Sequence, residues 1–155
     1  MKKVAVIFAL WCVAGLSQAM DTVIKMPVAD NVSADDAAES MKLRANLLNM
    51  QLVAELPLSK QVEAVTGKPQ RPMAIYQFCD AVVAKRMVDQ ALDFAAYLPC
   101  RIAVVQDAKG KTWLVMLNLD VVLANVSLPP DLAKEATTVR DNLLNIMQAG
   151  ARGDL

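Results

Sequence analysis

The sequence predicts an α+β domain in which helices pack on one face of a mixed or mainly antiparallel sheet. Three observations indicate this class. Segments with strand character alternate along the chain with segments of helical periodicity. Two apolar strands, residues 100–107 and 111–119, are separated only by a short polar turn, which forces at least one antiparallel pair. The resulting order, β-α-β-α-β-α-β-β-α, allows the helices to bury their apolar faces against one sheet.

The first two predicted elements are a strand and an amphipathic helix. Residues 21–28 alternate loosely, and Pro27 restricts them to a sheet edge because proline lacks the N–H that a central strand requires. Ser33 is a helix-capping residue, and Asp35 and Asp36 favour the positive end of a helix dipole. One face of this helix is apolar at helical spacing: Ala37, Met41, Ala45 and Leu48.

Two further strand–helix pairs follow. Residues 51–58 predict a strand, and residues 59–67 predict a short helix that ends at a glycine. After a proline-containing linker, residues 73–79 have the continuous apolar character of a buried strand. Asp80 directly follows this strand and can cap a third helix over residues 81–92.

The C-terminal part predicts a hairpin and a long helix. The two apolar strands of the hairpin join at residues 107–110, where a glycine suits the tight turn. Two consecutive prolines, residues 129–130, open the last helix, which is expected to end near Gly150. Its apolar stripe consists of Leu132, Ala136, Val139, Leu143 and Ile146.

The first 19 residues have the order of a cleavable secretory signal. Residues 2–3 are lysines, residues 4–16 form an apolar run, and residues 17–19 supply the small side chains that a signal peptidase reads. The run is short for a membrane span, and an uncleaved anchor is the alternative. We expect export to the periplasm and cleavage after Ala19. One domain, residues 20–155, then remains without stable membrane insertion.

Removal of this segment changes the charge and the cysteine count. Two of the 16 basic residues leave with it, so 14 remain against 16 acidic residues and the net charge is −2. A chain of this charge has no electrostatic basis for binding nucleic acid. Two of the three cysteines remain, Cys79 and Cys100. An even count in an oxidising compartment favours a disulfide between them.

The absence of histidine narrows the chemistry. Without it the chain has no Ser-His-Asp triad, no Cys-His pair and no His-ligated zinc or haem. The sequence also lacks a glycine-rich phosphate loop and a C-x-x-C motif. We therefore expect no catalytic residue, no cofactor and no metal, and a non-catalytic role in binding or interaction.

The two cysteines leave three interpretations open. The first is a structural disulfide, which would stabilise the fold by about 3 kcal/mol by closing the loop between them. The second is a pair that is redox-active or that binds sulfur or Cu(I), since Cys79 precedes a helix start whose N–H groups favour a thiolate. The third is two inert core residues. The charged residues nearest the pair in sequence are Asp80, Lys85 and Arg101.

A frame of residues around the cysteines resembles the bacterial family called domain of unknown function 302. The frame consists of Phe78-Cys79, Leu98-Pro99-Cys100 and the turn residues Asp107, Gly110 and Lys111. The resemblance runs from about residue 22 to the C-terminus, and it implies a small α+β domain with no established catalytic activity. Many members have Asn-Pro after the first cysteine and a histidine further on. Here Asp80-Ala81 replaces the former, and a role tied to that histidine does not apply.

The resemblance and the hairpin together favour an antiparallel arrangement of the two strands that carry the cysteines. The chain then returns at the same end of the sheet, where Cα atoms within about 7 Å of each other permit a bridge. We therefore expect Cys79 and Cys100 to lie at one sheet end and to be able to form a disulfide. Cys79 is expected to be the more nucleophilic thiol when the pair is reduced.

A homodimer is expected for two reasons. Members of the family resemble dimer-forming proteins. In addition, the apolar strand 111–119 would expose Trp113 or Leu117 if it lay uncovered at a sheet edge. A periplasmic protein is a further candidate partner.

Overall fold

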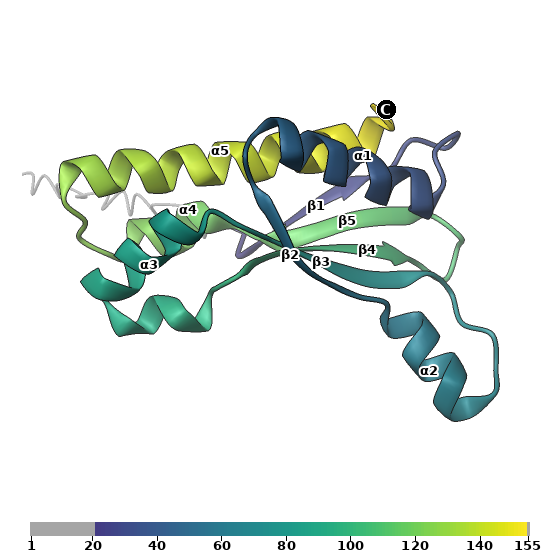
Figure 1. The fold of residues 1–155 in the computed structure, drawn as a ribbon. Helices are drawn as coiled ribbons and strands as arrows, with labels where there is room; N and C mark the ends of the chain where they lie inside the picture. Colours follow the sequence, from purple (N-terminus) through teal and green to yellow (C-terminus); the bar gives the residue numbers. More distant parts are fainter. Residues whose placement is uncertain (1–20, 155) are drawn as a thin grey trace, which may run out of the picture.

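The computed structural model describes residues 21–154, so the predicted signal segment lies outside the described residues. Five strands form one sheet, and helices pack around it (Figure 1). The elements in chain order are β1 (Val23–Pro27), α1 (Ala34–Leu47), β2 (Gln51–Leu56), α2 (Leu58–Thr66), β3 (Met73–Cys79), α3 (Ala81–Gln90), the 3-10 helix η1 (Leu92–Ala96), β4 (Cys100–Gln106), β5 (Thr112–Leu117), α4 (Leu119–Ala124) and α5 (Pro130–Arg152). This is the predicted α+β fold.

The sheet is antiparallel throughout, with the strand order β1-β5-β4-β3-β2. β1 lies at an edge, as Pro27 predicted. β4 and β5 form the predicted hairpin, in which the Asp107 carboxylate accepts the backbone N–H groups of Lys109 and Lys111. Gly110 in this turn has a φ of 83°, which favours glycine. β5 lies between β1 and β4, so it is not an uncovered edge, and this reason for expecting a dimer does not apply.

The main core lies between the sheet and the pair α1 and α5, which cover one face of the sheet (Figure 1). Ser33 caps α1 as predicted: its hydroxyl accepts the N–H of Asp36, and the Asp36 carboxylate accepts the N–H of Ser33. The largest fully buried hydrophobic side chains come from both helices, from the central strands and from the segments that join them: Phe78, Met41, Met50, Ile102, Leu114, Leu143, Ile146 and Met147.

Gly150 marks a close approach of α5 to α1. The helix ends at Arg152, close to the predicted end near Gly150, and Gly153 with a φ of 70° caps it in the left-handed conformation. A Cβ atom at residue 150 would lie 2.6 Å from Met41 Cγ and 2.9 Å from the Ala37 carbonyl oxygen. Gly150 is therefore a packing residue, because any side chain would push α1 away.

The remaining helices extend this arrangement at the two ends of the sheet (Figure 1). α3, η1, α4 and the N-terminal half of α5 form what we call the end lobe. It has its own small core of Met87, Phe94, Leu132 and Ala136. At the other end α2 projects from the sheet, and none of its residues is buried. None of the helices within residues 21–154 is long and apolar enough to cross a membrane.

Candidate functional site

The two cysteines lie at the same end of the sheet, as predicted. β3 ends at Cys79, β4 begins at Cys100, and the antiparallel register pairs Cys100 with Phe78. Cys79 is thus one position beyond the partner of Cys100. From the usual strand spacing and rise per residue, Cα atoms related in this way lie about 6 Å apart. The backbones are therefore close enough for a bridge.

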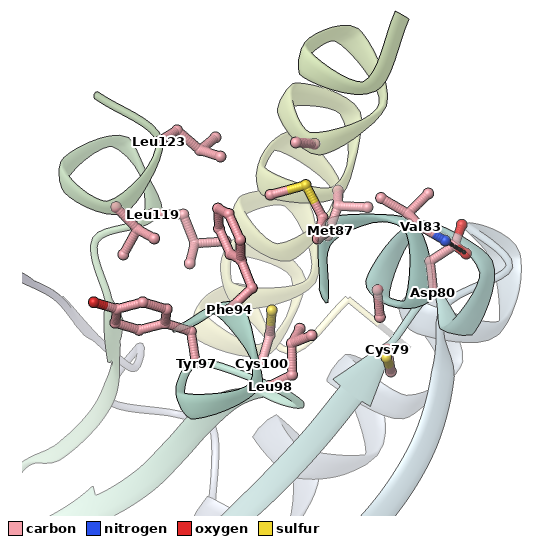
Figure 2. Close-up of a pocket in the computed structure, with 14 residues that line it drawn as sticks. Cys79, Asp80, Val83, Met87, Phe94, Tyr97, Leu98, Cys100, Leu119 and Leu123 are labelled. Atoms are coloured by element: carbon pink, nitrogen blue, oxygen red, sulfur yellow. Dashed lines mark hydrogen bonds between the residues drawn. The ribbon is translucent and has the colours of Figure 1, made fainter. Parts of the chain in front are cut away.

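The directions of the side chains prevent that bridge. Successive residues of a strand point to opposite faces of the sheet. Phe78 and Cys100 face α1 and α5, so Cys79 faces the open side. Figure 2 shows the two sulfur atoms directed away from each other. Both residues are free thiols, and the predicted disulfide is not formed, because cysteines whose Cβ vectors diverge cannot be joined without moving the backbone.

The surroundings favour the protonated form of both thiols. Burial raises the pKa of Cys100 to about 11, with a further rise from Cys79 and an opposing effect of Arg101. Burial also raises the pKa of Cys79, and the negative charge of Asp80 adds to that rise. The helix start expected to favour a Cys79 thiolate has no such net effect, because the Asp80 carboxylate already accepts two N–H groups in the first turn of α3.

The three charged residues predicted near the pair have different surroundings. Asp80 caps α3. Lys85 is exposed on α3 and forms an ion pair with Asp89 one turn further on. Arg101 is exposed on the open face of the sheet and has no ion-pair partner within residues 21–154. No cluster of three or more His, Cys, Asp or Glu side chains in that range is placed to hold a metal ion.

The structure reveals an apolar pocket in the end lobe that the sequence pattern did not predict (Figure 2). Its volume is about 60 Å³, and Cys79 and Cys100 lie at its base. The walls come from α3, η1, α4 and α5, and they include Val83, Met87, Phe94, Leu123, Ala136 and Val139. The Cys100 sulfur points into this pocket, whereas the Cys79 sulfur points away from it.

A second hollow, the open-face groove, lies mainly on the side of the sheet that α1 and α5 do not cover, and it also reaches Leu143 of α5. Its volume is about 320 Å³, and Arg101 is among its lining residues. Its apolar lining comes mainly from the open face of four strands: Val23, Ile75, Ala103, Val115 and Leu117. The groove shares Tyr97, Cys100 and Leu119 with the apolar pocket, so these residues form the boundary between the two hollows.

One sequence signal could have located this pocket. Asn118 caps α4 by accepting the N–H of Asp120, and an asparagine before an apolar run is a typical helix start. The interpretation of residues 111–119 as one continuous strand concealed this cap. As a result α4, which supplies one wall of the pocket, was not predicted.

The fold and the site define the class of this protein: a small antiparallel α+β domain with an apolar pocket beside two unbonded thiols. The profile of the family described as domain of unknown function DUF302 matches residues 24–150. The chain belongs to the DUF302 family.

A solved structure gives the same fold. The crystal structure of an uncharacterized conserved DUF302 protein from Bacillus stearothermophilus is similar with a TM-score of 0.69 and 18% sequence identity, over 84% of this chain and 98% of that chain. No curated protein matches the sequence. Function must therefore be argued from the site itself.

Proposed function

We propose that this DUF302 protein is a non-catalytic binding protein of the periplasm, and that its binding site is the apolar pocket. The observation that carries this proposal is the character of the pocket. Its walls are hydrocarbon side chains, and the Cys100 thiol at its base stays protonated at neutral pH. A preformed apolar pocket attracts apolar groups, because each Å² of apolar surface removed from water contributes about 25 cal/mol.

The positions of the thiols argue against a redox or Cu(I)-handling role as the alternative. A redox pair requires both sulfurs within bonding distance and one of them as a thiolate. Cys79 and Cys100 face opposite sides of the sheet, and the pKa of each is raised. We expect two free thiols per purified chain both before and after mild reductant. A thiol count that rises after reduction would favour the redox pair instead.

A neutral linear alcohol tests the pocket directly. 1-Dodecanol carries no charge, and the end of its unbranched chain suits a pocket that is too small for an aromatic ring. We expect isothermal titration calorimetry to show that it binds the native protein, and we expect Ala84→Leu to weaken binding about tenfold or more by filling the pocket. The matched control is Ala81→Leu, on the same helix but exposed to solvent. Equal dodecanol affinity in the two variants, with both folded by circular dichroism, would refute the assignment of the pocket.

The periplasmic location is supported by residues 1–19 alone. The test is the intact mass of the protein recovered from the periplasm. We expect a chain that begins at Met20. A mass that retains Met1 would favour the uncleaved anchor.

A second copy of the chain is the proposed partner. The support comes from the exposed edge at β2 and not from β5, which β1 covers. β2 is an edge strand, and its Val53 is 56% exposed, while Val65 on α2 is 88% exposed. Apolar side chains on an uncovered edge favour association.

Light scattering tests this assembly. We expect a dimer at tens of micromolar that the double variant Val53→Lys and Val65→Lys converts to a monomer. The control Leu92→Lys changes a leucine that is 80% exposed in η1 of the end lobe, and it should remain dimeric. A native monomer contradicts the proposal, and a dimer that survives the double variant contradicts this interface.

A further inference from the structure

The two hollows together indicate a ligand class, and this step rests on the proposed binding function. We infer that the protein binds a fatty acid, with the end of the hydrocarbon tail in the apolar pocket and the carboxylate beside Arg101. Three observations carry the inference: the size and lining of the pocket, its shared boundary with the groove, and the charge of the open face.

The apolar pocket suits the end of a chain better than a whole ligand. Its volume is about 60 Å³, whereas a cavity that holds a benzene ring is about 150 Å³. No cationic side chain lines it, and its one carboxylate, Asp80, is engaged in capping α3. A charged ligand group inside would lose its hydration without gaining a partner. The part of the ligand that enters is therefore uncharged.

The remainder of the ligand has a route out of the pocket. Tyr97, Cys100 and Leu119 line both the pocket and the open-face groove. Figure 2 shows Tyr97 and Leu119 on the same side of the pocket. A flexible chain that passes between these residues leaves the end lobe and continues along the apolar floor of the groove. The groove volume of about 320 Å³ lies at the lower end of the range for small-molecule sites.

The open face has the charge that an anionic head group requires. Arg101 lines the groove, is exposed and has no ion-pair partner within the described residues. Lys25 on β1 points to the same face, because its register partner Val115 does so. Among the strand residues that face this side, none is acidic. The planar guanidinium of Arg101 matches a carboxylate with two parallel hydrogen bonds.

The experiment compares two ligands that share a tail and differ in the head. Dodecanoate below its micelle concentration and dodecanol below its solubility limit are titrated calorimetrically into the native protein, Arg101→Gln and Lys85→Gln. We expect Arg101→Gln to weaken dodecanoate about tenfold, the loss of one charged hydrogen-bonding partner, and to leave dodecanol unchanged. Lys85→Gln removes the same charge outside both hollows and should change neither ligand.

The outcomes separate this inference from the proposed function. If dodecanol binds and dodecanoate binds the native protein and Arg101→Gln with equal affinity, the pocket remains and the fatty-acid assignment is overturned. If dodecanol does not bind the native protein, the proposed function itself fails. A loss of dodecanoate binding that is equal in Arg101→Gln and Lys85→Gln would reflect net charge alone and would also overturn the assignment to Arg101.

Discussion

The two halves of α5 pack in different ways. The C-terminal half lies against α1 and the sheet, and Gly150 lets the two helices meet without an intervening side chain. The N-terminal half lies in the end lobe, which buries a small core and encloses the apolar pocket. The same helix therefore belongs to a filled core at one end and to an incompletely filled one at the other.

The difference has a physical cause in the lengths of the elements. The main core has long, regular surfaces on both sides, a five-stranded sheet and two helices of several turns. The end lobe is built from α3, η1 and α4, and the last two are short. Short helices present few side chains and cannot interdigitate over a large area, so space remains between them. The filled half provides stability, and the other half leaves the apolar pocket open.

Removing one phenylalanine from each region gives the largest expected contrast. Phe78→Ala should reduce the free energy of unfolding by about 4 kcal/mol, because Phe78 is 0% exposed and its loss leaves a sealed cavity. Phe94→Ala should cost about 2 kcal/mol, because Phe94 lines a pocket that its neighbours can partly close. Urea denaturation measures both, and equal losses would mean that the two regions are packed equally well.

The contact between α1 and α5 gives the next largest effect. Gly150→Leu should cost about 3 kcal/mol, because its first side-chain atom already overlaps Met41 and the Ala37 carbonyl. Gln148→Leu is the control, since Gln148 is exposed on the same helix. Urea denaturation measures the loss of unfolding free energy in Gly150→Leu and in Gln148→Leu. A similar cost at both positions would show that α1 moves aside freely.

The sequence was a good guide to the main core for reasons of periodicity. Residues 73–79 were predicted as a strand with the observed bounds, and Ser33, Asp80 and the turn before Lys111 marked element ends correctly. Each of these signals is local: a cap, a turn or an apolar repeat. The end lobe is less predictable because η1 and α4 are too short to show a repeat, and Asn118 lies within an apolar run that resembles one continuous strand.

The candidate site depends on strand register, which local sequence signals do not determine. The position of Cys79 and Cys100 at one sheet end followed from an antiparallel pairing that the structure confirms. Whether their side chains meet depends on the register, and a shift of one residue reverses the face of every side chain. Phe78, and not Cys79, pairs with Cys100. Nothing in the spacing of the two cysteines carries that information.

The pH dependence of stability probes the boundary between the two regions. The Cys100 thiol ionises near pH 8.5 in the unfolded chain and near 11 in the folded one. Its contribution to stability is therefore complete below about pH 8.5 and is lost as the pH rises to about 11. The expected loss is on the order of 2 kcal/mol. The measurement is the difference in unfolding free energy between the native protein and Cys100→Ala at pH 7.5 and at pH 10.5.

Two observations would contradict this prediction. The first is a difference between the native protein and Cys100→Ala that does not change with pH. The second is an equal change in Cys79→Ala, because burial is the main cause of both raised pKa values and Cys79 is less deeply buried than Cys100.

The smallest expected effect comes from changing one valine to isoleucine in each region. The free energy of unfolding should rise in the end lobe and fall in the main core. Val139→Ile adds a methylene group beside the apolar pocket and should stabilise by about 0.5 kcal/mol by filling unoccupied space. Val104→Ile adds the same group to the main core, where Val104 is 2% exposed, and should destabilise by about 1 kcal/mol through overpacking. Thermal denaturation of both variants measures the sign of each change in stability. Equal signs would indicate that the pocket is not empty space.

The exposed helix α2 has a consequence for how the chain can vary. β2 and β3 are hydrogen-bonded antiparallel neighbours, and such strands can be joined by a turn of two residues. Here residues 57–72 connect them through α2, which buries none of its own residues. The strands thus do not depend on the length or content of this connection. It is a position at which the chain can be shortened, opened to new termini or given an inserted module while the sheet and both cores stay intact.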